Sequence, residues 1–251
     1  MPVGDYYPDV YPNVLDDQFP SIGLVPITNF FPGTAFAAYD VSVFESLTFS
    51  GEDIVNIENL LNPGTHDMDC SSTPVGYGTL DGQPALDTNG VDEAGSISLV
   101  GSGLSPGDHM GAHVVWASIG HDGSSGWIQP TGIGGAYGRT TGDDRAILQQ
   151  TVGGAIVYAT RDDSVPHADD LDFRDVTGMR ARRDGGSWTT GTDTAGVTGV
   201  NTAVVGRVGG NFELISLSAL VLTNAPTEAQ MDEFLTGFVA TRFPTIAAAL
   251  P

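Results

Sequence analysis

The sequence predicts an all-β protein: an antiparallel β-sandwich with one C-terminal amphipathic helix and an extended N-terminal arm. Three observations support this fold class. Short β-rich runs are separated by Gly, Asp, Asn and Pro from Ala35 onward, one helical period occurs near the C-terminus, and prolines alternate with aromatic residues near the N-terminus. The chain has 251 residues with 40% hydrophobic content, enough to bury one core. We therefore predict an arm over residues 1–36 and one jelly-roll sandwich domain over residues 37–251.

The first 32 residues have the composition of an extended arm. They contain six of the fifteen prolines, which exclude a helix and a central strand. Aromatic side chains are costly to leave in water, so we expect those of the arm to dock on a protein surface: Tyr6, Tyr7, Tyr11, Phe19, Phe30 and Phe31. The pattern is compatible both with docking on the arm's own domain and with docking on a neighbouring copy.

Seven apolar runs are predicted to form strands: Tyr39–Phe49, Ile54–Glu58, Ser96–Val100, Ala112–Ile119, Ala155–Thr160, Thr202–Val208 and Phe212–Leu222. The last run is apolar on both faces, which predicts a central strand. The glycine-rich segments Gly120–Gly142 and Arg182–Gly199 are predicted to be long loops.

One helix is predicted near the C-terminus. Thr227 and Gln230 have the spacing of a capping box, and Pro244 ends the helical pattern. Between them, apolar residues recur at helical spacing: Met231, Phe234, Leu235, Phe238 and Val239. We expect this stripe to be buried and the helix to pack across an edge or end of a sheet.

The charge balance is strongly acidic. Lys is absent, the nine basic residues are all Arg, and the 31 acidic residues comprise seven Glu and 24 Asp, which gives a net charge of -22. Such a charge strains a compact fold in dilute buffer, whereas at molar salt the Debye length falls to roughly 3 Å and screens the repulsion. The composition therefore predicts adaptation to high salt, although an acidic mesophilic surface protein is the alternative. It also argues against nucleic-acid binding.

The lack of apolar and signal-peptide segments bears on the compartment, whereas the cysteine content does not. The chain contains no run of 18 apolar residues, and its first residues lack the basic and apolar regions of a signal peptide, so neither a membrane span nor an ordinary signal peptide is expected. The single cysteine, Cys70, cannot form an internal disulfide.

Two regions of the chain resemble a known family. Residues 53–90, with the motif Leu80-Asp81-Gly82-Gln83-Pro84, and residues 212–243, with the closing strand, turn and helix, resemble the laminin-G-like, concanavalin A-like jelly roll of tailed-virus and bacterial surface proteins. The sequence departs from that pattern in two places: the usual Trp of the early strand is absent, and Ser218 stands where the family has a Glu. The resemblance implies the fold, and a structural or attachment role.

Catalytic motifs of related sandwich enzymes are absent from the sequence, so no catalytic residue is assigned. The paired carboxylates of glycan-cleaving relatives and the Arg-Glu-Arg strand of lyases do not occur. Asp170 and Asp172 would share one face of a strand if extended, but a solvated acidic loop is the favoured interpretation. His109 and His113 are four residues apart, as zinc ligands on a helix are, but this stretch spans Gly111 and the start of a predicted strand, so no zinc site is assigned.

No metal site or cofactor is predicted from a motif. A calcium ion at the sandwich rim is compatible with the resemblance, and its candidate ligands are Asp67, Asp69, Asp169, Asp170 and Asp172.

The candidate glycan-binding residues are aromatic side chains in glycine-rich segments, where a flat ring can stack on a sugar: Trp127, Tyr137 and Trp188. The favoured alternative is that each ring folds back over the core. Trp116, within an apolar run, is expected to be a core residue.

We therefore expect a non-enzymatic virion protein of a halophilic tailed virus, either structural or host-attaching, such as a capsid decoration, turret, tail or fibre component. It would act outside the cell at high salt as a homo-oligomer, assemble with other virion proteins through its arm, and contact host glycans with its loops. The alternative is a stand-alone carbohydrate-binding lectin or adhesin domain.

Overall fold

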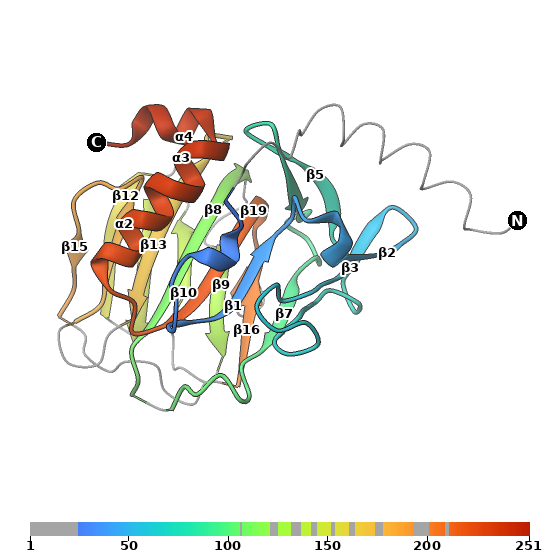
Figure 1. Ribbon diagram of the computed structural model, residues 1–251, viewed down its shortest axis with the longest axis horizontal. Helices are drawn as coiled ribbons and strands as arrows, with labels where there is room; N and C mark the ends of the chain where they lie inside the picture. The colour runs from blue at the N-terminus through green and yellow to red at the C-terminus, as the bar shows by residue number, and fades with distance from the viewer. Residues whose placement is uncertain are drawn as a thin grey trace, which may run out of the picture.

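The computed structural model describes residues 25–105, 107–120, 125–131, 137–141, 145–151, 154–160, 164–173, 178–192, 201–208 and 211–251 (Figure 1). Within these ranges the chain forms two large antiparallel sheets packed face to face, with a helix across the outer face of one of them. The predicted all-β sandwich with one C-terminal helix is confirmed.

The first sheet has eight strands in the described residues. Seven lie in the order β15-β14-β13-β8-β19-β6-β5, and β1 pairs with β19. Their bounds are β1 (Ala35–Asp40), β5 (Gly76–Leu80), β6 (Gln83–Asp87), β8 (Met110–Gly120), β13 (His167–Phe173), β14 (Arg180–Arg183), β15 (Thr189–Thr190) and β19 (Leu214–Asn224). The strand predicted to be central, β19, lies between β8 and β6, and its residues from Ile215 to Thr223 are buried.

The second sheet has nine strands in the order β12-β11-β10-β9-β16-β7-β4-β3-β2, counted over the described part of the chain. Their bounds are β2 (Leu47–Ser50), β3 (Asp53–Ile57), β4 (Met68–Asp69), β7 (Gly95–Ser98), β9 (Ser125–Thr131), β10 (Tyr137–Thr141), β11 (Arg145–Thr151), β12 (Gly154–Thr160) and β16 (Thr202–Val205). A short separate pair is formed by β17 (Arg207–Val208) and β18 (Asn211–Phe212).

Several predicted boundaries were wrong. The run from Tyr39 to Phe49 is not one strand: β1 ends at Asp40, whose carboxylate accepts a hydrogen bond from the backbone N–H of Ser42 at 3.0 Å, and the 3-10 turn η3 (Phe44–Ser46) precedes β2. The segment predicted as the loop Gly120–Gly142 contains β9 and β10. Gly206, with a φ of 83°, separates β16 from β17 in a conformation that glycine adopts without steric cost.

The C-terminal helix is continuous from α2 (Glu228–Phe234) through a π-helical stretch, η4 (Leu235–Val239), to α3 (Ala240–Arg242). Its capping box is present, because the Thr227 side chain accepts from the Gln230 backbone and the Gln230 side chain accepts in return from the Thr227 backbone. A last helix, α4 (Pro244–Ala249), follows at Pro244. No helix in the described residues is long and apolar enough to cross a membrane.

The core has two layers. Between the sheets lies a cluster that includes Trp116 and Tyr39, both almost fully buried. On the outer face of the first sheet, Val115, Ala219 and Val221 pack against the helix stripe. The helix therefore covers a sheet face, and the expectation that it would pack across an edge or end was wrong. The apolar outer face of β8 and β19 supplies the surface that it buries (Figure 1).

The last part of the predicted arm lies within this outer layer. Ile27 of the short turn η2 (Ile27–Asn29) and the following Phe30 and Phe31 are buried against the helix of the same chain. The Phe30 ring lies edge-on to Phe234 with ring centres 5.8 Å apart. The other arm residues, Tyr6, Tyr7, Tyr11 and Phe19, lie outside the described residues.

Candidate functional site

A ladder of opposite charges joins β13 to β14. The antiparallel register places Asp169 opposite Arg183, Asp170 opposite Arg182, and Asp172 opposite Arg180. All three aspartates are at most 2% exposed, so the interpretation of this segment as a solvated acidic loop was wrong. The predicted placement of Asp170 and Asp172 on one strand face is correct, because alternate residues of a strand point to the same side.

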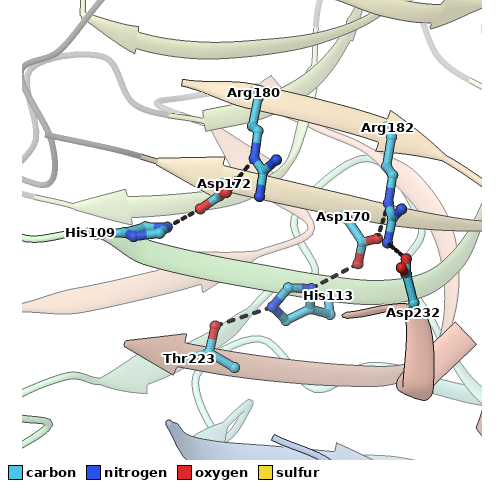
Figure 2. A network of polar contacts seen from close by, with 8 residues as sticks. All are labelled: His109, His113, Asp170, Asp172, Arg180, Arg182, Thr223 and Asp232. Atoms are coloured by element: carbon cyan, nitrogen blue, oxygen red, sulfur yellow. Dashed lines mark hydrogen bonds and ion pairs between the residues drawn. The ribbon is translucent and has the colours of Figure 1, made fainter. Parts of the chain in front are cut away.

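On the outer face of the sheet, Asp170 links three elements (Figure 2). Its carboxylate accepts a hydrogen bond from Arg182 Nε at 2.7 Å and lies 2.8 Å from His113 Nδ1. Because a carboxylate only accepts hydrogen bonds, Nδ1 carries a proton, and the other ring nitrogen lies 3.1 Å from Thr223 Oγ1 on β19. Arg182 also donates to Asp232 on the helix at 2.7 Å.

Asp172 anchors a second cluster on the same face. It accepts hydrogen bonds from Arg180 Nε at 2.7 Å and from the His109 ring (Figure 2). Burial acts to raise the pKa of Asp172, but the hydrogen bonds and charges of His109 and Arg180 outweigh it and lower the pKa below its usual value. His109 and His113 thus bind separate carboxylates.

Trp188, one of the three predicted glycan-binding residues, lies against this cluster. The guanidinium carbons of Arg180 and Arg182 are 3.9 Å and 4.5 Å from its ring centre, and its Nε1 donates to Glu228 at 2.6 Å. The ring therefore packs back on its own domain, as in the alternative interpretation. Trp127 and Tyr137 belong to β9 and β10, and their side chains lie outside the described residues.

On the inner face, Asp169 binds the Arg183 guanidinium through Nε at 2.8 Å and Nη2 at 2.9 Å. Trp116 Nε1 and the Tyr158 hydroxyl also donate to it, at 2.9 Å and 2.7 Å. Burial acts to raise the pKa of Asp169, but Arg183, the Tyr158 hydroxyl and the charge of His167 hold the pKa below its usual value. Trp116 is the core residue that the sequence predicts, at 1% exposed.

Accessibility decides the role of the His113–Asp170 pair. His113 is 0% exposed, and the Phe31 ring stacks on it with ring centres 4.3 Å apart. A general base must come within hydrogen-bond reach of its substrate, and Phe31, Phe234 and the sheet enclose this imidazole. In this geometry the network fastens the helix and the residues around Phe31 to the sheet.

The candidate calcium ligands do not form one group around a common point in the described residues. Asp67 accepts from the backbone N–H groups of Asn59 and Gly64, and Asp69 accepts from Ser71, which lowers the pKa of Asp69. The three β13 aspartates are paired with arginines. In the described residues no group of three or more His, Cys, Asp or Glu side chains is arranged to hold a metal ion.

A cleft of about 410 Å³ opens beside the end of β1, and we call it the Asp40–Arg242 cleft. Segments far apart in the sequence meet there: η2, the β1–η3 turn, the loop after β3, the start of β6 and the end of α3. Its lining residues are Pro26, Ile27, Thr28, Asp40, Ser42, Val43, Glu45, Leu60, Gln83 and Arg242. The volume and the mixed apolar and polar lining are typical of small-molecule sites.

A buried ion pair forms one wall of the cleft. Arg242 donates from Nη1 to Asp40 at 2.6 Å and to Ser42 at 3.0 Å, and from Nη2 to the Val25 carbonyl at 3.2 Å. Its guanidinium carbon lies 4.3 Å from the Phe238 ring centre, and both charged residues are under one-tenth exposed. The pair therefore holds the β1–η3 turn and residue 25 against the helix.

Three polar side chains of the cleft carry no hydrogen bond or ion pair within the described residues: the Thr28 hydroxyl, the Glu45 carboxylate and the Gln83 amide. Sequence reasoning missed this site. Two signals pointed to it. The first is that Gln83 lies in the motif that carries the resemblance to the jelly-roll family. The second is that Arg242 lies four residues after Phe238, on the buried apolar stripe of the helix, where a buried cation needs an anionic partner.

No family model matches the sequence, and no curated protein matches it. Solved structures do match. Trypanosoma rangeli sialidase aligns at a TM-score of 0.60 with 12% identity, over 89% of this chain and 36% of that chain. The binding domain of Paraclostridial Mosquitocidal Protein 1 aligns at 0.58 with 8% identity, over 79% and 52%. The fold is concanavalin A-like.

A third match is the receptor binding domain of botulinum neurotoxin type G, at a TM-score of 0.54 with 8% identity, over 80% of this chain and 51% of that chain. The chain thus spans about a third of the sialidase and about half of the two binding domains. At these identities the likeness concerns the fold. It agrees with the concanavalin A-like part of the predicted resemblance, and none of these three proteins is a virus protein.

Proposed function

We propose that this chain is a non-catalytic binding domain that recognises glycans through the Asp40–Arg242 cleft. The observation that supports the proposal is the combination of this cleft with a sandwich whose structural relatives include two domains named for binding. This is the lectin or adhesin alternative that the sequence also allows.

The chemistry of the cleft suits a sugar ring. Val43 and Leu60 offer apolar contact for the C–H groups of a ring, while Gln83 both donates and accepts hydrogen bonds and Thr28 offers a hydroxyl. Hydroxyl groups also donate and accept, so they match this mixture. The Arg242–Asp40 ion pair holds the wall in place before a ligand arrives, which reduces the ordering cost of binding.

The test is a glycan array probed with the full chain in multimolar KCl, followed by calorimetry on any hit. Gln83→Ala removes the free amide and should weaken binding at least about tenfold, the loss expected for one or two hydrogen bonds. The matched control is Thr48→Ala, which truncates an exposed polar strand residue outside the cleft lining. Binding to no glycan at all, or equal effects of both variants, would contradict the proposal.

A second candidate function is assembly or host attachment in a halophilic virion, outside the cell. It rests on the acidic, Lys-free composition and on the Pro- and aromatic-rich residues 1–24. Because Ile27, Phe30 and Phe31 are core residues, a truncation that tests the arm should remove residues 1–24 and no more. Light scattering after size exclusion in multimolar KCl compares it with the full chain. A defined oligomer that becomes a monomer supports assembly through the arm, and two monomers contradict it.

A further inference from the structure

We infer that the Asp40–Arg242 cleft selects neutral saccharides over acidic ones, with Glu45 as a specificity-determining residue. This inference rests on the proposed glycan-binding function and names its ligand class.

Among the described lining residues the one arginine, Arg242, already binds an anion. Arg242 directs Nη1 to Asp40 and Ser42 and Nη2 to the Val25 carbonyl. Its side chain is 7% exposed. Arg242 Nε has no hydrogen-bond partner in the described residues, but it is buried. An incoming carboxylate or sulfate would therefore compete with Asp40 for this guanidinium, and displacing Asp40 would leave a buried carboxylate without its counter-ion. Lys is absent from the sequence, so no lysine can take over that role.

The charged side chain of the described lining that carries no ion pair is negative. Glu45 is exposed on η3, where its carboxylate carries no ion pair within the described part of the chain. The net charge of -22 adds a repulsive field for any anion that approaches. An acidic sugar would therefore enter beside an unpaired like charge, whereas a neutral sugar can donate a hydroxyl hydrogen bond to the same carboxylate.

The remaining polar groups favour hydroxyls over an ammonium group. Gln83 offers two N–H donors as well as a carbonyl, and Thr28 offers a hydroxyl. An ammonium group only donates, so it cannot use the Gln83 N–H donors. A neutral ring with several hydroxyls can satisfy donors and acceptors at once, and its apolar face can contact Leu60 and Val43.

The experiment uses matched pairs of ligands: neutral oligosaccharides and their sialylated or sulfated derivatives, titrated into the full chain by calorimetry. The wild-type chain should bind each neutral member at least about tenfold more tightly than its acidic derivative at the lowest KCl concentration that leaves its circular dichroism signal intact. The ratio should shrink at 3 M KCl because the Debye length falls to a few ångströms.

Two isosteric variants separate a local effect from a global one. Glu45→Gln should reduce the preference for the neutral member several-fold, because it removes the free charge and keeps the shape of the side chain. Glu52→Gln makes the same change in charge at an exposed residue of the β2–β3 turn, outside the cleft, and should leave the preference unchanged.

Two results would overturn the inference. One is binding of acidic derivatives as tight as, or tighter than, that of their neutral counterparts, which would leave the proposed glycan-binding function intact. The other is an equal effect of Glu45→Gln and Glu52→Gln, which would assign the preference to net charge instead of to the cleft. Failure of every saccharide to bind would instead contradict the proposed function itself.

Discussion

Arg182 offers a direct comparison between a buried and an exposed ion pair, because one guanidinium binds two carboxylates. Its Nε donates to Asp170, whose side chain is 2% exposed, and its Nη2 donates to Asp232, whose side chain is 57% exposed. Both distances are 2.7 Å. Asp170→Asn and Asp232→Asn therefore remove the same charge from the same arginine at two different depths.

The expected losses of stability differ several-fold. Removing one partner of a buried pair costs about 3–5 kcal/mol, because the remaining charge stays buried without compensation. Asp170→Asn also takes the negative charge from the His113 ring, which lies 2.8 Å away. An exposed pair contributes about 0–1 kcal/mol, so Asp232→Asn should fall in that range. For a chain of this size the melting temperatures should drop by roughly 6–20 °C and by less than about 4 °C, respectively.

The assay is urea unfolding of both variants and the wild-type chain at one fixed KCl concentration, monitored by tryptophan fluorescence, because Trp116 is buried in the core. Equal midpoints and slopes mean equal stability, and a changed slope would indicate a change in the unfolded or native ensemble. If both variants lose the same free energy of unfolding, or if Asp170→Asn loses less than about 1 kcal/mol, burial does not set the strength of this pair.

Four further predictions follow from burial and charge. Phe234→Ala should cost about 3–5 kcal/mol in urea unfolding, because the ring is 1% exposed between the helix and the sheet; an unchanged midpoint would show that the helix does not rest on this face. Burial, and then the charge of Asp69, raise the pKa of the Cys70 thiol to about 12. This thiol should therefore react slowly with Ellman's reagent in the native protein and rapidly in urea. A fast reaction in the native protein would contradict the burial of Cys70. The folded-state pKa of Asp169 lies below its unfolded value, because Arg183 and the other groups around it outweigh the raising effect of burial. The stability that Asp169 contributes is therefore complete above about pH 4 and is lost as the pH falls through the folded pKa. A free energy of unfolding that stays constant down to about pH 2 would contradict this prediction. Dialysis from about 3 M to 0.1 M KCl should diminish the circular dichroism signal as screening is withdrawn, and full structure at low salt would end the halophilic interpretation.

Features that depend on neighbours in the chain were predictable from the sequence. The C-terminal helix followed from its capping box and apolar stripe, both of which depend on residues three and four positions apart. The central position of β19 followed from its apolar residues on both faces, since a strand exposed on one side has polar residues there. Two such features, together with regular turn residues, were enough to indicate the sandwich.

The segment of β13 shows why the acidic residues could not be placed. Asp169, Asp170 and Asp172 are typical of a solvated loop when read along the chain, since isolated carboxylates are rarely buried. They are buried because Arg183, Arg182 and Arg180 lie opposite them in an adjacent strand. The Arg-rich run was visible in the sequence, but its register against the aspartates is a tertiary contact.

The cleft is likewise a product of tertiary structure. Its wall joins Asp40 to Arg242, two residues 202 positions apart, and Gln83 enters from a third segment. The sequence alone determined the acidic, Lys-free charge balance, the strand and helix periods and the buried aromatic residues, because these are properties of composition and of local spacing. Only the folded chain decided which charges neutralise one another and which polar groups stay free, because the Coulomb energy and the desolvation of a side chain depend on distances in space.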